Sequence, residues 1–294
     1  MKGSVPMLSK YDIFCKVVEY GGFTKAANAI SYSQSAVSQT VKNLEQELDL
    51  TLLNRGKDGI HLTGDGEAIF SYIQGIANAE KALVRRQKEL HGLTNSVIRI
   101  GTFTSVSRNL LPGWMVDFKA LYPDIRFVLE QGEYTTISEW VQNDVVDFGF
   151  VNMHAAPDME GQLLYTDEMC AVLPLDHPFA KKEVVSLQAL AEEPLILLDE
   201  GEFNSPLRAF EQAGLEPQIA YEVYDDYTII AMVEKKLGIS MMYRKVLCGY
   251  EDHVALCPVD ADLSRPVGMI WNNWDTLPIA ARRFIEFIAK QPIA

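Results

Sequence analysis

Polar side chains suited to reading nucleic acid share one face of a helix predicted over residues 33–48. They are two amides, two hydroxyls and one amine, at Gln34, Ser35, Ser38, Gln39 and Lys42. An amide pairs with both N6 and N7 of adenine in the major groove, and hydroxyls or helix-start N–H groups suit phosphate. These residue types predict a DNA-reading face, with the polar side of an ordinary amphipathic surface helix as the alternative.

This helix needs a packing partner on its other side. Its apolar residues recur at spacings of four, three and four, at Val37, Val41, Leu44 and Leu48. Such spacing is typical of a single buried stripe on an α-helix. The stripe therefore predicts that other elements hold the polar face outward.

A short helix is predicted to come before it, starting within residues 23–27 (Phe-Thr-Lys-Ala-Ala). Thr24 is expected to cap this helix, and the two alanines let the longer helix pack closely. Thr24, Lys25 and Ser33 join the candidate DNA contacts. A further helix over residues 8–20 is expected to pack behind the other two, so the pattern predicts a helix-turn-helix.

A tight hairpin is predicted over residues 52–62, because Gly56 and Gly59 supply turn conformations. Arg55 and Lys57 belong to this hairpin, where they are suited to phosphate or to the minor groove. A solvated charged turn is the alternative, and it applies more to Lys57 than to Arg55. The hairpin is interpreted as the wing of a winged helix-turn-helix.

A larger set of residues keeps a fixed order and spacing through this region. Its members are Phe14, Gly22-Phe23-Thr24, Ala26-Ala27, Ser33-Gln34, Ala36-Val37-Ser38, Leu44-Glu45, Leu48, Leu52, Arg55 and Leu62-Thr63. This set resembles the LysR-type transcriptional regulators. The resemblance implies a winged helix-turn-helix at residues 1–64, a dimerising linker helix at 65–92 and a two-lobed effector domain similar to periplasmic binding proteins. Ser35 and Gln39 depart from the family, which commonly has Pro and Arg at these positions.

A long helix is predicted after Thr63, which is expected to cap it, with Asp65 and Glu67 well placed in its first turn. Apolar residues then recur every seven positions, with Tyr72 and Ala79 between them, at Ile69, Ile76, Leu83 and Leu90. Such a narrow seam predicts a coiled coil with a partner helix. A helix docked on its own domain is the alternative. The family resemblance favours a homodimer formed through this helix and implies a homotetramer.

Strand-like and helical segments alternate from residue 97 onward. Strands are predicted at 97–101, 125–129, 146–151, 194–198, 238–242 and 267–271, and helices after 110–112, at 137–142 and at 278–289. This alternation predicts βα units and a mainly parallel sheet, so the fold class is α/β overall, after an all-α N-terminal unit. Lobe I is assigned to 96–168 and 267–294, and lobe II to 169–266. The two lobes are expected to enclose a ligand cleft at the carboxyl ends of their strands.

Loops that follow strands are predicted to face this cleft. The candidate effector-binding residues are Thr102, Phe103, Thr104, Ser105, Tyr134, Thr135, Thr136, Asn152, Asp199 and Phe203. Hydroxyls and helix-start N–H groups predict an anionic or polar metabolite. Phe103 and Tyr134 stand where the family often has Ser or Thr, which favours a ring-bearing or apolar effector. The alternative is that both rings belong to the core.

Charge is divided unevenly along the 294 residues, whose net charge is −14. Residues 1–95 carry 11 basic and 10 acidic side chains, whereas residues 96–294 carry 15 and 30. Phosphate repels the acidic part, so the nearly neutral N-terminal part is expected to face DNA. Because so few phosphates are neutralised per subunit, DNA affinity is expected to depend strongly on dimerisation and on salt.

Signals for catalysis, metal binding and membrane insertion are weak. The five histidines are scattered, and the sequence has no His-x-x-x-His, nucleophile elbow or glycine-rich phosphate loop, so neither an enzyme nor a cofactor is expected. Asp225 and Asp226 supply too few ligands for a hard cation. No apolar run approaches the roughly 18 residues that a membrane span needs, and residues 1–6 are not followed by a hydrophobic signal core, which predicts a cytoplasmic protein without membrane contact. Cys248 and Cys257 sit among apolar residues and are predicted to pack as reduced thiols rather than to sense peroxide.

These patterns predict a sequence-specific transcriptional regulator that binds double-stranded DNA and a small-molecule effector of unknown identity. RNA polymerase is a further candidate partner. The rival interpretation is a solute-binding or enzymatic α/β domain with an incidental helical N-terminus, and a purely architectural DNA binder is a third.

Overall fold

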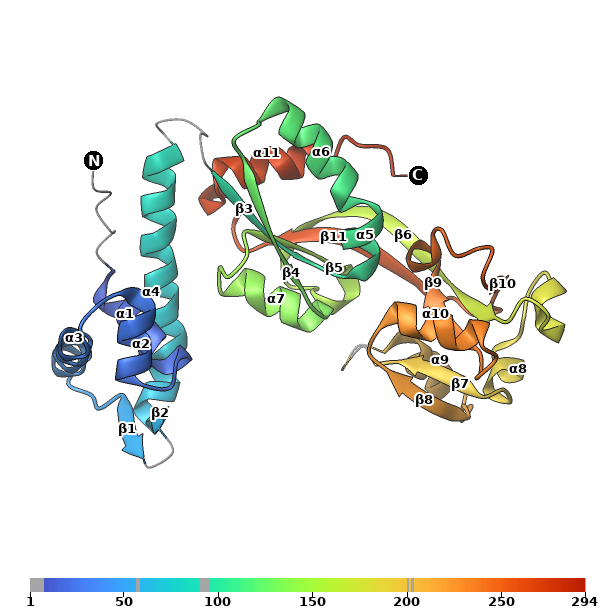
Figure 1. Ribbon diagram of the computed structural model, residues 1–294, viewed down its shortest axis with the longest axis horizontal. Helices are drawn as coiled ribbons and strands as arrows, with labels where there is room; N and C mark the ends of the chain where they lie inside the picture. The colour runs from blue at the N-terminus through green and yellow to red at the C-terminus, as the bar shows by residue number, and fades with distance from the viewer. Residues whose placement is uncertain (1–7, 57–58, 90–95, 200, 202–203, 294) are drawn as a thin grey trace. The chain divides into compact units, whose positions relative to one another are not determined.

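The computed structural model describes residues 8–56, 59–89, 96–199, 201 and 204–293. The chain divides into two compact units, Met1–Gly92 and Leu93–Ala294. Helices dominate the first unit, and the second combines helices with β-sheet (Figure 1). The predicted α/β class with a helical N-terminal unit is confirmed.

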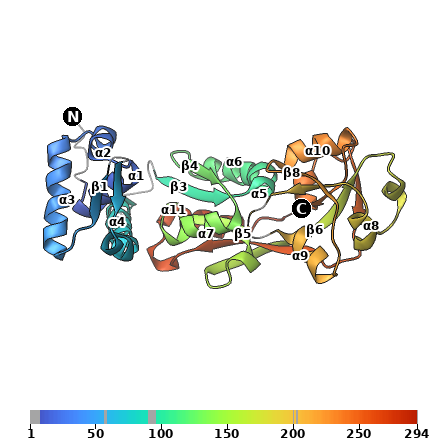
Figure 2. The same cartoon turned by 90° about the horizontal axis from the view of Figure 1, so that it is seen from below.

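The N-terminal unit consists of three packed helices, a hairpin and a long helix. These elements are α1 (Lys10–Glu19), α2 (Phe23–Ile30), α3 (Gln34–Leu48), β1 (Leu53–Gly56), β2 (Gly59–Leu62) and α4 (Gly64–Glu89). The apolar stripe of α3 is buried through Val37, Val41 and Leu44, whereas Leu48 is exposed. Ala26 and Ala27 are buried where α2 packs on α3. In both views α3 forms an edge of its unit on the side away from α4 (Figures 1 and 2), and α1 packs against both helices.

Side-chain caps mark where three of these helices begin, and Ser9 caps α1. The Ser33 hydroxyl accepts a hydrogen bond from the backbone N–H of Ala36 at 3.2 Å, at the start of α3. Thr63 Oγ1 accepts from the N–H of Gly66 at 2.9 Å and starts α4, as the sequence predicted. The expected Thr24 cap is wrong, because Gly22 is the N-cap of α2 and no side chain caps that helix. Thr24 therefore lies inside the first turn of α2.

The C-terminal unit contains two lobes that share long strands. Lobe I holds β3 (Val97–Thr102), α5 (Thr104–Asn109), α6 (Leu111–Leu121), β4 (Arg126–Gln131), α7 (Tyr134–Gln142), β5 (Phe148–Asn152), η1 (Met153–Ala155), η4 (Trp274–Thr276) and α11 (Ile279–Ile288). Lobe II holds η2 (Pro178–Lys181), α8 (Leu187–Ala191), β7 (Leu195–Leu198), α9 (Ser205–Gln212), β8 (Ile219–Val223), α10 (Asp226–Glu234), β9 (Ser240–Tyr243), η3 (Arg244–Leu247) and β10 (Ala255–Pro258). The shared strands are β6 (Glu160–Leu173) and β11 (Ser264–Trp271).

The main sheet has the strand order β10-β6-β11-β5-β3-β4, with β9 also paired to β6. Strand β3 runs parallel to β4 and β5, and in lobe II β7 runs parallel to β8. Strands β6 and β11 pair antiparallel with each other, and their other partners in the sheet are also antiparallel. The expected mainly parallel sheet is therefore wrong, because the two crossing strands return the chain in opposite directions.

Each lobe has its own hydrophobic core. In lobe I, α6 and α11 cover one face of the sheet and α7 covers the other (Figure 1). Helix α7 approaches closely because Gly149 has no side chain, and a Cβ there would lie 2.4 Å from Ile137 Cγ2. The lobe II core packs β7, β9 and α10 against the buried end of β6. The junction of the lobes is thus formed by continuous strands rather than by a loose linker.

Candidate DNA-binding face and effector cavity

Helix α3 presents a polar face to solvent. Gln34, Ser35, Gln39 and Lys42 are exposed, and Ser38 is half-buried. The Gln39 amide nitrogen donates to Asn43 Oδ1 at 2.7 Å, one turn further along the helix. Because Asn43 is exposed as well, this face carries two linked amides that can donate to and accept from base edges.

The first turns of α2 and α3 add further exposed polar groups. Thr24 and Lys25 are exposed on α2. The Ser33 hydroxyl lies 3.1 Å from that of Ser35 at the start of α3. Helix starts of this kind offer backbone N–H groups and hydroxyls to a phosphate. The predicted DNA contacts on α2 and α3 therefore lie on exposed or half-exposed surface.

The hairpin β1–β2 is tied to α3 by one carboxylate. Glu45 Oε1 accepts from the backbone N–H of Leu52 at 2.8 Å and of Leu53 at 3.2 Å. On the other strand, the N–H of Ile60 donates to the Gly21 carbonyl at 3.3 Å. Arg55 pairs with Ile60 in the hairpin register. The Arg55 side chain and Lys57 lie outside the described residues.

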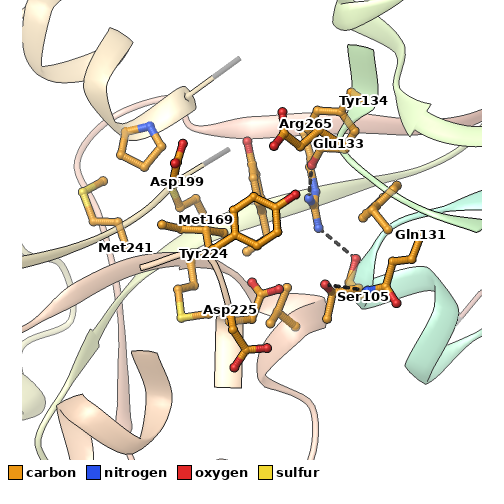
Figure 3. Close-up of a pocket in the computed structure, with 18 of the residues that line it drawn as sticks. Ser105, Gln131, Glu133, Tyr134, Met169, Asp199, Tyr224, Asp225, Met241 and Arg265 are labelled. Carbon is orange, nitrogen blue, oxygen red and sulfur yellow. Dashed lines mark hydrogen bonds between the residues drawn. The ribbon is translucent and has the colours of Figure 1, made fainter. Parts of the chain in front are cut away.

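A cavity of about 330 Å³ lies between the two lobes (Figure 3). Of the predicted effector-binding residues, Phe103, Thr104, Ser105, Tyr134 and Asp199 line it. Phe103 and Tyr134 also belong to the lobe I core and meet edge to face, with ring centroids 5.1 Å apart. The two alternatives for these rings therefore coexist, because each ring packs in the core and has an edge in the cavity.

The other predicted effector residues lie elsewhere. Thr102 is fully buried, and its hydroxyl donates to the Phe103 carbonyl at 3.4 Å. Asn152 is buried, and its side chain accepts from the N–H of His154. Thr135 and Thr136 are half-buried in the first turn of α7 and are not part of the lining. Phe203 lies outside the described residues.

Arg265 is a cavity residue that the sequence analysis missed. It lies in β11 opposite Asp167 in β6, and both side chains are 2% exposed with 2.8 Å between Nη2 and Oδ2. Arg265 also donates to Ser105 Oγ at 3.0 Å and to the Tyr134 hydroxyl. Its guanidinium carbon lies 3.7 Å from the ring centroid of Tyr243. This arginine therefore joins side chains of both lobes at the wall of the cavity.

Carboxylates and methionines make up much of the remaining lining. Glu133, Asp225 and Asp226 join Asp199 as acidic residues, and Met169, Met241 and Met242 are apolar neighbours. Burial raises the pKa of the Asp226 carboxyl above its ordinary value, although a hydrogen bond with Thr104 and the charge of Arg265 act in the opposite direction. The cavity is therefore rich in negative charge.

The cysteines differ from one another in burial. Cys170 and Cys257 are buried and Cys15 is half-buried, and all four cysteines are free thiols. Burial raises the pKa of Cys15 to about 11 and that of Cys170 to about 12, so both remain protonated at neutral pH. The expected packing of Cys248 is wrong, because this residue is exposed after the 3-10 turn η3.

The described part of the chain has neither a metal-binding cluster nor a membrane-spanning helix. No group of three or more His, Cys, Asp or Glu side chains there is placed to hold a metal ion. None of the helices seen in that part combines the length and apolar character needed to cross a membrane.

Comparison with known proteins gives matches over both units. Residues 8–67 match the family model of the bacterial regulatory helix-turn-helix protein, lysR family, and residues 91–292 match that of the LysR substrate binding domain. The HTH-type transcriptional regulator YvbU of Bacillus subtilis (strain 168) is 31% identical over 283 residues, which cover 95% of this chain and 96% of YvbU.

Solved structures share the fold over nearly the whole chain. Full-length OxyR C199D from Pseudomonas aeruginosa has a TM-score of 0.72 at 21% identity and covers 96% of this chain and 93% of its own. Full-length CbnR, solved in complex with its target DNA, has a TM-score of 0.66 at 20% identity and covers 95% of this chain and 97% of its own.

Proposed function

The chain belongs to the LysR family of transcriptional regulators, and we propose that it reads half of a two-fold symmetric DNA site through α3 while an effector between the lobes sets its regulatory state. As a member of this family it is a sequence-specific DNA-binding regulator with an effector-binding domain, and it is not an enzyme. In this proposal residues 1–64 bind DNA, residues 65–92 pair two subunits, and the lobes at 96–168 with 267–294 and at 169–266 hold the effector.

The polar face of α3 is the observation that carries the proposed DNA contacts. Gln34, Ser35, Gln39 and Lys42 are exposed on a helix whose opposite stripe is buried and whose far end is tied to the wing by Glu45. Such a helix fits the major groove with its N-terminal residues toward the bases. Thr24, Lys25, Ser33 and Ser38 extend the contact surface, together with Arg55 and Lys57 of the wing.

We further propose that Gln39 recognises adenine. An arginine at this position would pair with guanine, whereas an amide pairs with N6 and N7 of adenine. The hydrogen bond to Asn43 supports this role, because it limits the rotamers of the Gln39 side chain before DNA is bound. Less conformational entropy is then lost when the amide meets a base.

Pairing of subunits through α4 is supported by a second apolar face on this helix. Ile73 and Ala77 are buried against the rest of their own unit, whereas Tyr72 and Leu83 are 73% and 70% exposed and Ile76 is 43% exposed. Docking of α4 on its own domain accounts for the burial of Ile73 and Ala77, but not for the exposed apolar residues. The second face is suited to the equivalent helix of another subunit. Leu90, at the next position of the seven-residue repeat, lies outside the described residues.

The cavity is proposed to bind the effector through Phe103, Thr104, Ser105, Tyr134 and Asp199. Both lobes supply lining residues, and both share β6 and β11. A ligand that contacts both lobes stabilises one arrangement of the lobes over others and so shifts the population of regulatory states. Assembly into tetramers, contact with RNA polymerase and a cytoplasmic location complete the proposal.

A retardation assay with DNA from upstream of the protein's own gene tests the proposed reading of DNA. Gln39→Ala should weaken binding by about 1–3 kcal/mol, the cost of losing one bidentate base contact. Gln46→Ala is the matched control, because Gln46 is exposed on the same helix two turns further from its N-terminus and should have little effect. Equal losses for the two variants, or selected sites with invariant guanine opposite Gln39, would contradict the proposal.

A further inference from the structure

The charge of the cavity between the lobes indicates what kind of effector it accepts. This inference rests on the proposed effector role of that cavity, and it concerns the chemical class of the ligand. A volume of about 330 Å³ suits a small metabolite. The lining residues determine whether the cavity favours a negatively or a positively charged ligand.

The positive charge in the lining is already engaged by the protein. Among the described residues that line the cavity, Arg265 is the one basic side chain. It is paired with Asp167, donates to Ser105 and Tyr134, and is covered by the ring of Tyr243. An anionic effector would have to share this guanidinium with the carboxylate of Asp167, which is 2% exposed and would repel it.

Two of the helices that start at the cavity, α7 and α10, have acidic residues at their N-termini. Glu133 is the N-cap of α7, Asp225 is the N-cap of α10, and Asp226 is the first residue of α10. Asp225 Oδ2 already accepts from the N–H and the hydroxyl of Thr228, each at 2.7 Å. These carboxylates compensate the partial positive charge of the helix ends. The dipoles of α7 and α10 are therefore unsuited to hold a second anion.

Asp226 is the carboxylate that most requires a counter-charge. It is 8% exposed and lines the cavity, and its hydrogen-bond partner, Thr104, is a neutral hydroxyl across the cleft. A carboxylate removed from water without a cation in direct contact is costly when ionised, which is why its pKa is raised. A cationic ligand beside Asp226 would lower that cost.

Polarisable groups line the rest of the space. The ring of Tyr224 projects among the carboxylates of Glu133, Asp199 and Asp225, with Met169 and Met241 nearby (Figure 3). Tyr224 is 68% exposed, so a ligand in the cavity can reach its ring face. Aromatic faces attract ammonium groups.

We propose that the effector of this regulator is a small organic cation, an amine that is protonated at neutral pH and bound between Asp226, Asp199 and the ring of Tyr224. Binding would neutralise the excess negative charge shared by the two lobes and favour their closure around the ligand. The sequence-based expectation of an anionic or polar metabolite counted hydroxyls and helix starts. Apart from Asp199, it did not include the carboxylates that the fold brings to the same cavity, at Glu133, Asp225 and Asp226.

Probes that differ only in charge test this proposal on the full-length protein. Tyramine, 4-ethylphenol and 4-hydroxyphenylacetate share a phenol ring and are cationic, neutral and anionic, and 1,4-diaminobutane with succinate forms an aliphatic pair. Calorimetry should detect binding of tyramine or 1,4-diaminobutane at least tenfold tighter than binding of the matched anion. Tighter binding of an anion, or no binding of either amine at millimolar concentration, would overturn the proposal.

Two variants locate the bound cation. Asp226→Asn should weaken amine binding about tenfold or more, and Asp199→Asn, at an exposed position where folding is not at risk, should weaken it severalfold. Asp252→Asn is the matched control, because Asp252 is an exposed carboxylate of lobe II outside the lining. If amine binding is unchanged in both cavity variants, or falls equally in the control, the proposed site is wrong.

DNA retardation with the same preparations separates this inference from the proposed function. Failure of amine binding while specific DNA binding persists would overturn the ligand class alone. Amine binding by a protein that shows no specific DNA binding would contradict the proposed DNA reading and leave the ligand class supported.

Discussion

Removing one partner of the buried Asp167–Arg265 pair should destabilise the C-terminal unit strongly. Both side chains are 2% exposed with 2.8 Å between Nη2 and Oδ2. Loss of one partner leaves an unpaired charge in the interior, which lowers the free energy of unfolding by about 3–5 kcal/mol. For a unit of this size, each kcal/mol lowers Tm by about 2–4 °C, so Asp167→Asn or Arg265→Gln alone should lower it by about 6–20 °C. The double variant carries no stranded charge and should recover much of the loss.

Tryptophan fluorescence gives a clean assay for this prediction. The four tryptophans all lie in the C-terminal unit, at Trp114, Trp140, Trp271 and Trp274, so their thermal transition reports on that unit alone. Asp176→Asn serves as the control, because it breaks an ion pair with Lys236 in which both side chains are exposed, and such pairs contribute little to stability. The reasoning is refuted if either single variant costs no more than this control, or if the two losses simply add in the double variant.

Three further predictions follow from contacts in the two units. Glu45→Ala should destabilise the N-terminal unit by about 1–3 kcal/mol in urea unfolding and weaken DNA binding, because two backbone N–H groups lose their acceptor. Glu47→Ala, which removes an exposed ion pair with Lys10, should cost much less, and equal costs for the two variants would argue against the tie to the wing. Leu83→Glu should yield monomers in sedimentation while Ser71→Glu, on the far side of α4, leaves dimers, and a dimeric Leu83 variant would exclude the α4 interface. The Asp226 carboxyl has a raised pKa in the folded protein, so its contribution to stability is fully present at pH values below its pKa in the unfolded chain and is lost as pH rises through its pKa in the folded protein. Asp226→Asn should therefore raise Tm at pH 7 but not at pH 3. A higher Tm at both pH values would point to another cause.

Elements with a strong local pattern could be predicted from the sequence. The stripe of Val37, Val41 and Leu44 gave α3, and Thr63 marked the start of α4, because side-chain periodicity and caps are properties of neighbouring residues. Strand direction is a different matter. An apolar run such as residues 267–271 indicates a buried strand but does not say whether its neighbour is parallel, so the antiparallel pairing of β11 was missed.

The site was harder to predict because its central pair is assembled from distant parts of the chain. Arg265 was assigned to lobe II, just before the strand predicted at Val267, whereas β11 begins at Ser264 and places Arg265 opposite Asp167. No local pattern links these two residues. Cys248 was misjudged for a related reason, because its buried neighbours Val246 and Leu247 suggested packing although the backbone turns outward after them.

The sharing of β11 between the lobes also determines when the protein can fold as it leaves the ribosome. Strand β11 lies between β5 and β6 in the sheet, yet it is synthesised after every element of lobe II. The first lobe therefore emerges with a gap at the centre of its sheet, and the edges of β5 and β6 stay open until residues 264–271 arrive. Lobe II can form its own hydrophobic core during that interval. The nascent chain is thus exposed to strand-pairing errors longest in the lobe that is translated first.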